Sequence, residues 1–144
     1  MDKGIYCLIL ACAEACTVKI GALGPTEFQK GWYLYAGSAL GSGGLSRVSR
    51  HIRFFRERYR KPKWHIDYLM ATDEITLSGV ICAKTEERLE CILAKNIGGA
   101  CTADFGCSDC SCASHLFYRT EPPETEVARA FEKTGLVPIY HLIR

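Results

Sequence analysis

The 144-residue sequence has no apolar run close to the ~20 residues that a membrane-spanning helix needs. This absence excludes an integral membrane protein built from helices. The first residues, Met1-Asp2-Lys3-Gly4, lead directly into an apolar segment without a signal-peptide pattern, so we expect a cytoplasmic protein. The sequence also has no internal repeat and no linker-like stretch, which predicts a single domain over residues 1–144.

Net charge is also scarce, because 18 Lys and Arg residues against 16 Asp and Glu residues give only +2. Basic charge therefore matters only where it is locally concentrated. Such a patch is the electrostatic footprint of a protein that binds a polyanion, although a solvated helix face explains it equally well. The patch sets eight basic residues against one acid, Glu57: Arg47, Arg50, Arg53, Arg56, Arg58, Arg60, Lys61 and Lys63.

The hydrophobic pattern predicts an α/β (α+β) fold with a small mixed, mainly antiparallel sheet flanked by helices. We expect strands at residues 4–11, 16–23, 31–37, 75–83, 115–119 and 137–143. Helices are expected at about residues 45–58, 64–70, 85–96 and 124–133. Gly24-Pro25-Thr26 predicts a turn, so the first three strands should form an antiparallel meander.

The stretch GWYLYAGSALGSGGLSRVSRH, residues 31–51, is the centre of the functional argument. It joins a strand, a glycine-rich bend and the start of a basic helix. Glycine adopts backbone conformations that other residues disfavour, and a helix start can offer backbone N–H groups to an anion. The stretch therefore predicts a binding site for a nucleic-acid phosphate.

The basic helix presents two kinds of surface. At about 100° per residue, Val48, Ile52 and Phe55 fall on one face, which we expect to be buried. Long basic side chains beside such a face can lean over a cleft while their stems stay packed. That flank consists of Arg47, His51 and Arg58, whereas Arg50 and Arg53 point outward.

Four motifs occur in a recognisable order along the predicted strands and helix. Gly4-Ile5-Tyr6 comes first, Tyr35-Ala36-Gly37-Ser38 and the glycine loop follow, and Arg47 and His51 come next, four residues apart. This order resembles the GIY-YIG nuclease superfamily, and within it the Uri-type stand-alone branch. The resemblance covers about residues 3–96, and the cysteine-rich extension over residues 97–144 is similar to that branch as well.

The resemblance implies metal-dependent hydrolysis of phosphodiester bonds, with DNA favoured over RNA and DNA repair as one setting. It implies that Tyr6 helps to activate water, that Tyr35 positions water and substrate, and that Gly37 allows close backbone approach. Arg47 would bind the scissile phosphate, and Glu90 would hold one Mg²⁺ or Mn²⁺ ion. A cation and an arginine stabilise the charge that develops on phosphate, and nearby positive charge lowers the pKa of a tyrosine.

The remaining assignments are less specific. His51 and His65 are candidate proton relays from Tyr6, although a structural histidine at a helix start explains His65 equally well. Glu86 shares a helix edge with Glu90 and is the alternative ligand, or a carboxylate that acts only on the helix dipole. Magnesium suits one carboxylate together with waters and phosphate oxygens. We expect the nucleic-acid-binding surface to comprise Ser38, Arg50, Arg53, Arg58, Lys61 and Lys63.

The sequence departs from the usual family pattern in two places. The 28 residues between Tyr6 and Tyr35 are far more than is usual, so we expect an inserted strand between the motif strands. The asparagine that usually follows the glutamate is absent, since no asparagine occurs after Asn96. Its place is empty or taken by Ser108, Asp109 or His115. A nucleic-acid-binding module of the same fold without catalysis is therefore the alternative function.

Nine cysteines suggest a third reading, a thiol- or zinc-regulated interaction protein. Zinc prefers four tetrahedral ligands, and a CxxC pair supplies two of them. The absence of a second CxxC motif disfavours zinc, so buried thiols beside the cleft and a disulfide between Cys107 and Cys110 stay open. The potential ligands are Cys107, Cys110, Cys112 and His115.

Overall fold

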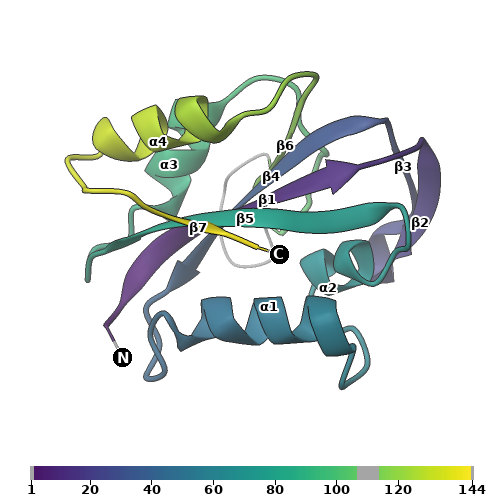
Figure 1. Ribbon diagram of the computed structural model, residues 1–144, viewed down its shortest axis with the longest axis horizontal. Coiled ribbons are helices and arrows are strands. Elements are labelled where there is room, and N and C mark those ends of the chain that lie inside the picture. The colour runs from purple at the N-terminus through teal and green to yellow at the C-terminus, as the bar shows by residue number, and fades with distance from the viewer. Residues whose placement is uncertain (1, 107–113, 144) are drawn as a thin grey trace.

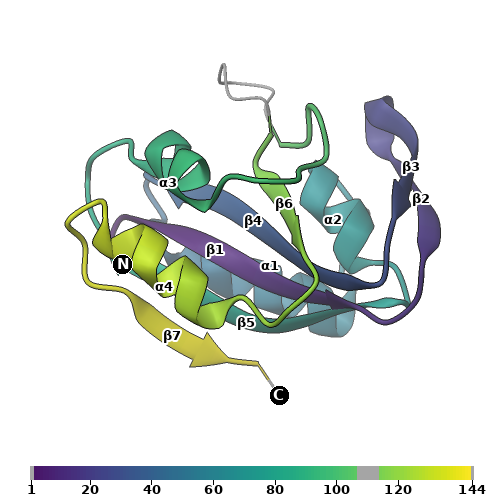
Figure 2. The ribbon, with the colours of Figure 1, turned by 90° about the horizontal axis from the view of Figure 1, so that it is seen from above.

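The computed structural model describes residues 2–106 and 114–143. A sheet lies between two layers of helices, with α3 and α4 over one face and α1 and α2 over the other (Figure 1, Figure 2). This arrangement confirms the predicted α+β fold, with a sheet flanked by helices. Within the described ranges, no helix is both long and apolar enough to cross a membrane.

The main sheet has five strands in the order β6-β4-β1-β5-β7, and each neighbouring pair is antiparallel. Its central strand β1 is almost completely buried, because its alternate side chains enter opposite cores. Tyr6 and Leu8 face α1 and α2, whereas Ile5 and Cys7 face α3 and α4. The strands are β1 (Gly4–Cys12), β4 (Gly31–Ala39), β5 (Ile75–Lys84), β6 (Leu116–Arg119) and β7 (Ile139–Leu142).

The predicted three-stranded meander is wrong. β1 pairs directly with β4, while β2 (Cys16–Ile20) and β3 (Gly24–Phe28) form a separate two-stranded sheet. The chain reverses at a short 3₁₀ helix, Gly21–Leu23, whose first residue, Gly21, has a φ of 45° and which is followed by Gly24 with a φ of 72°. The expected turn at residues 24–26 is therefore the start of a strand, and the expected inserted strand is one half of a hairpin.

The helices are α1 (Ser46–Glu57), α2 (His65–Met70), α3 (Glu90–Ile97) and α4 (Glu124–Glu132). On α1 the buried side chains are Val48, His51 and Phe54, so the predicted buried face with Ile52 and Phe55 is rotated from the observed one. Both of these residues are only half-buried at its border.

The third helix begins later than expected. The Thr85 hydroxyl accepts a hydrogen bond from the backbone N–H of Glu87 and closes a turn, and the helix starts only at Glu90. Glu86 therefore lies before the helix and is exposed. The shorter helix separates the two glutamates that the sequence placed on one helix edge.

Candidate active site

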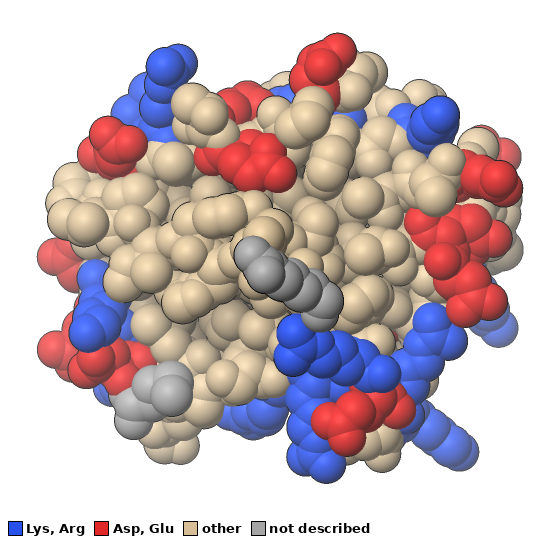
Figure 3. Space-filling view, viewed as in Figure 1, with Lys and Arg blue, Asp and Glu red and all other residues tan. Residues whose placement is uncertain are grey.

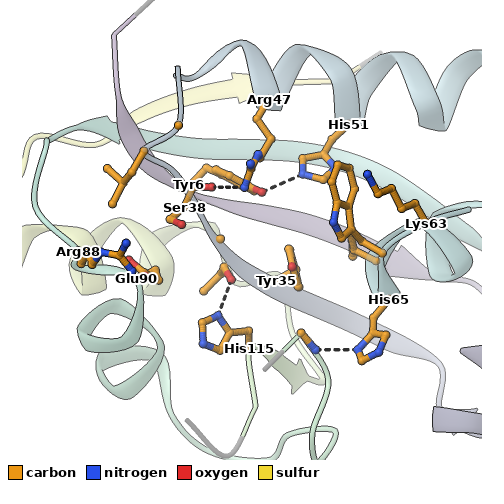
Figure 4. A pocket seen from close by; sticks show the side chains of 17 residues that line it. Tyr6, Tyr35, Ser38, Arg47, His51, Lys63, His65, Arg88, Glu90 and His115 are labelled. Carbon is orange, nitrogen blue, oxygen red and sulfur yellow. Dashed lines mark hydrogen bonds between the residues drawn. The ribbon is translucent and has the colours of Figure 1, made fainter. Parts of the chain in front are cut away.

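A cavity of about 610 Å³ lies where β1, β4, α1 and the start of α3 meet the segment that leads into α2. Figure 4 shows side chains from all these elements pointing toward one another. Every residue that the sequence assigned to catalysis lines this cavity: Tyr6, Tyr35, Gly37, Arg47, His51, His65 and Glu90.

Tyr6 and His51 form a buried pair at one wall of the cavity. The Tyr6 Oη atom lies 2.8 Å from His51 Nε2, and the two residues are 2% and 3% exposed. Burial, and next the neighbouring Tyr35, raise the pKa of Tyr6, while the positive charge of Arg47 opposes this shift. Burial also lowers the pKa of His51 to about 4. At neutral pH the pair therefore consists of a protonated phenol and a neutral imidazole.

Gly37 makes room for the Tyr6 ring. The two residues are directly opposite each other on β4 and β1. A Cβ atom at residue 37 would lie 2.5 Å from Cζ and 2.6 Å from Oη of Tyr6. The close approach expected at Gly37 is thus made by the tyrosine ring, which any larger residue would displace.

Arg47 is held at the cavity by the end of β4, because its Nη1 donates a hydrogen bond to the Ser38 carbonyl at 2.9 Å. The guanidinium also borders a second hollow of about 200 Å³, which is lined by Arg50 and the glycine loop 41–44. Arg47 therefore lines both hollows, the larger one with Lys63 and Arg88 and the smaller one with Arg50.

Backbone N–H groups at the start of α1 do not supply the expected anion site. Those of Gly44, Ser46 and Arg47 donate to carbonyls of the same turn, and that of Leu45 donates to Asp2. Because these four groups are already used, they are not available to an anion, and the Arg47 and Arg50 side chains are the cationic groups that line this hollow.

Glu90 is the first residue of α3, and its side chain enters the cavity. Its Oε2 atom is buried and has no hydrogen-bond partner among the described residues. A buried carboxylate oxygen without a partner is costly, and a divalent cation would satisfy it. Within residues 2–106 and 114–143, no cluster of three or more His, Cys, Asp or Glu residues is arranged to hold a metal. Waters and phosphate oxygens would complete the coordination of Mg²⁺.

The structure separates Glu90 from its alternative Glu86. Glu86 is exposed and does not line the cavity. Arg88 does line it and lies beside Glu90 (Figure 4). Only Glu90 of the two glutamates is therefore positioned to hold a cation in this cavity.

Two further histidines line the cavity in opposite tautomers. His65 Nδ1 accepts a hydrogen bond from the Gly106 N–H at 2.9 Å, so its ring proton is on Nε2. His115 Nδ1 lies 2.9 Å from the carbonyl oxygen of Ala36, which can only accept, so Nδ1 donates and Nε2 keeps its lone pair. The pKa of His65 is lowered by burial. His65 is therefore a hydrogen-bond donor at Nε2, whereas His115 is an acceptor there.

Only His115 of the predicted thiol or zinc cluster can be located. Its Nε2 lies 3.8 Å from Sγ of Cys91, a partner that the sequence analysis missed. Cys107, Cys110 and Cys112, like Ser108 and Asp109, lie outside the described residues. Zinc, a disulfide and free thiols at that cluster stay predictions.

The expected nucleic-acid-binding residues are divided between the cavity and the outer surface. Ser38 and Lys63 line the cavity, and Arg50 lines the second hollow. Lys61 is exposed outside both. Acidic neighbours oppose the outer arginines, since Arg53 pairs with Glu57 and Arg58 pairs with Asp73, each at 3.2 Å. Figure 3 shows these mixed charges at the C-terminal end of α1.

The lining residues that sequence reasoning did not assign to the site include Trp64, Arg88 and Gly106. Trp64 had a usable signal, since it is an aromatic residue that directly follows the basic run. Arg88 and Gly106 had none, because they reach the cavity only through the folding of distant loops.

No curated protein and no solved structure is similar enough to match this chain. A family model does match residues 5–136, a span that contains every residue lining the cavity. The chain therefore belongs to the family described as the domain of unknown function DUF123.

Proposed function

We propose that the protein is a divalent-metal-dependent endonuclease that hydrolyses phosphodiester bonds, with DNA as the favoured substrate. The observation that carries this proposal is the buried Oε2 of Glu90, which has no hydrogen-bond partner in the described part of the chain and lies in the same cavity as Arg47 and the Tyr6–His51 pair. A carboxylate for a cation, a guanidinium for phosphate and a proton-transfer pair are the groups that this reaction requires.

In this proposal a water oxygen attacks phosphorus, and the bond from phosphorus to the leaving oxygen breaks. Arg47 binds a non-bridging oxygen, and its position on the Ser38 carbonyl keeps the guanidinium in place. As the water loses its proton toward Tyr6, the Tyr6 hydroxyl proton passes to His51 Nε2, 2.8 Å away. When bound at Glu90, Mg²⁺ supplies further stabilisation of the charge on phosphate. The Nε2–H of His65 is available as a donor to the departing oxygen.

The raised pKa of Tyr6 shows which neighbours its proton transfer needs. Burial makes the phenol hold its proton, and nearby positive charge opposes this shift, so a cation in the cavity would ease the transfer. Arg47 supplies part of this charge, and Glu90 provides a place for the rest. The low pKa of His51 means that it holds the transferred proton only briefly.

The order of the sequence motifs is a second support. Tyr6, Tyr35, Arg47 and Glu90 occur in the order that the GIY-YIG resemblance implies, and all four line one cavity. His115 lines the same cavity and is the described candidate for the place of the usual asparagine.

A nucleic-acid-binding module without catalysis is the second candidate function. Among the described residues, the cavity offers Glu90 as its only carboxylate, and no three-residue metal cluster accompanies it. The basic residues Arg47, Lys63 and Arg88 would still bind phosphates without a cation.

Cleavage assays separate these candidates. Labelled duplex, flap, branched and single-stranded DNA would be incubated with Mg²⁺ or Mn²⁺, and with EDTA as the metal-free control. We expect cleavage only with a divalent cation, and losses of roughly 10²–10³ in rate for Arg47→Ala and Tyr6→Phe, by analogy with the removal of one transition-state donor. Arg56→Ala removes the same charge from the exposed side of α1 and should cleave normally. If binding occurs and no substrate is cut, the module without catalysis replaces the nuclease.

A further inference from the structure

Trp64 is a large apolar side chain that stays open to solvent at the cavity. It precedes α2, lines the cavity and is 40% exposed. The other tryptophan, Trp32 on β4, is packed against the core beneath α3 and α4. Trp64 therefore presents an accessible aromatic surface at the edge of the cavity, whereas Trp32 does not line it.

The backbone of Trp64 is held in place by a hydrogen bond to a buried carboxylate. Its backbone N–H donates to Oδ2 of Asp67 at 3.0 Å, and Asp67 is completely buried. The same oxygen accepts hydrogen bonds from the N–H of Lys63 at 2.9 Å and from Nη1 of Arg60 at 2.8 Å. The ring also makes an edge contact with His51, with their centroids 6.4 Å apart. A ring held in this way loses little conformational freedom when a ligand binds.

Three cations surround this ring. The Lys63 Nζ and Arg60 Cζ atoms each lie 5.2 Å from its centroid, and the Arg47 Cζ atom lies 5.9 Å from it. Proteins that bind single-stranded nucleic acid combine an aromatic surface for bases with basic groups for phosphates. Trp64 and its neighbours combine both groups at the edge of the cavity.

We propose that Trp64 stacks on an unpaired base of the nucleotide next to the phosphate at Arg47. The identity of that phosphate as the one to be cleaved rests on the proposed function; the stacking itself requires only binding. A base within a duplex is stacked between its neighbours and has to leave them to reach a protein ring. The protein therefore prefers single-stranded or locally unpaired substrates to a fully paired duplex.

The test uses the fluorescence of Trp64 itself. In Trp32→Phe, Trp64 is the only tryptophan, and a short oligothymidylate is titrated in the presence of EDTA so that no cleavage can occur. We expect quenching of the emission. An abasic oligonucleotide of the same length and charge should bind about 5- to 150-fold more weakly and leave the emission unchanged, as expected for the loss of one stacked base. Equal quenching or equal affinity with the abasic strand would overturn the proposal.

A matched pair of variants tests the ring without fluorescence. Trp64→Ala should bind oligothymidylate about 5- to 150-fold more weakly, whereas Trp64→Phe, which keeps a ring, should lose less. Tyr140 provides the control, because it is 46% exposed on β7 and lies outside the cavity. Tyr140→Ala should bind as the wild type does. Identical affinities for Trp64→Ala and Tyr140→Ala, or tighter binding of duplex than of single strands, would refute stacking.

The two proposals fail in different ways. Base-dependent quenching without any metal-dependent cleavage removes the nuclease function and keeps the stacking site. Metal-dependent cleavage without base-dependent quenching keeps the nuclease and removes the stacking site.

Discussion

Replacing Gly37 by alanine tests whether the Tyr6 ring really occupies the space above this residue. The new Cβ atom would lie 2.5 Å from Cζ, 2.6 Å from Oη and 2.8 Å from Cε2 of Tyr6. The ring therefore has to move, although it is 2% exposed within the core and hydrogen-bonded to His51. Overpacking costs about 1–3 kcal/mol, and the lost hydrogen bond costs about 1 kcal/mol. We expect the free energy of unfolding to fall by about 2–4 kcal/mol.

Urea-induced unfolding, followed by circular dichroism, measures this loss. Gly41→Ala is the matched control, because a Cβ at that glycine would have no atom within 4 Å. In a Tyr6→Ala background the ring is absent, so Gly37→Ala should then cost little. If Gly37→Ala is as stable as Gly41→Ala in the wild-type background, the Tyr6 ring does not lie where the structure has it.

Two further predictions concern buried charge. His51 has a pKa of about 4 in the fold against 6.5 ordinarily, so below pH 6.5 the unfolded chain binds a proton that the folded chain does not. Protonation of the unfolded chain therefore destabilises the fold as the pH is lowered below 6.5, by about 3 kcal/mol at pH 4. The urea midpoint of His51→Gln should lack this part of the pH dependence, and identical pH profiles for the variant and the wild type would contradict the low pKa of His51. Asp67→Ala should lose about 3 kcal/mol because it removes the buried acceptor of the Lys63 and Trp64 N–H groups and of Arg60, whereas Asp73→Ala, which breaks the exposed pair with Arg58, should change the urea midpoint little. Equal losses in the free energy of unfolding for Asp67→Ala and Asp73→Ala would contradict the difference in burial between the two carboxylates.

The convergence of the site residues could be predicted because the resemblance to the GIY-YIG nuclease superfamily implies it, while local rules only place each side chain on its own element. Tyr6 and Tyr35 lie on strands with period-2 alternation, and Arg47 and His51 lie four residues apart on one helix. The motif order then predicts which elements meet. In the structure these four side chains line one cavity, as expected.

Where the sequence prediction failed, the deciding contacts were distant in the chain. The buried face of α1 includes His51 because its partner is Tyr6, 45 residues away. Helical periodicity alone favours the apolar Ile52 and Phe55 instead. In the same way, Gly24-Pro25 is a strong turn signal locally, and only the pairing with β2 makes it the start of a strand.

The start of α3 shows a different limit of sequence reasoning. Thr85 is a good capping residue, and Glu86 and Glu87 suit a helix start. The Thr85 side chain instead closes a turn, and the helix begins five residues later at Glu90. Thr85 therefore accepts a local hydrogen bond as a capping residue would, but this bond closes a turn and does not begin the helix.

The most direct test of the proposed nuclease is single-turnover cleavage of labelled DNA with Mn²⁺ by wild type, Glu90→Gln and Glu86→Gln. Glu86 is exposed outside the cavity, so its variant controls for the loss of one negative charge. The proposal predicts metal-dependent cleavage by wild type and Glu86→Gln, and none by Glu90→Gln, which should still bind DNA because it repels phosphate less. Cleavage by Glu90→Gln at the wild-type rate would contradict the role of Glu90 in holding the cation.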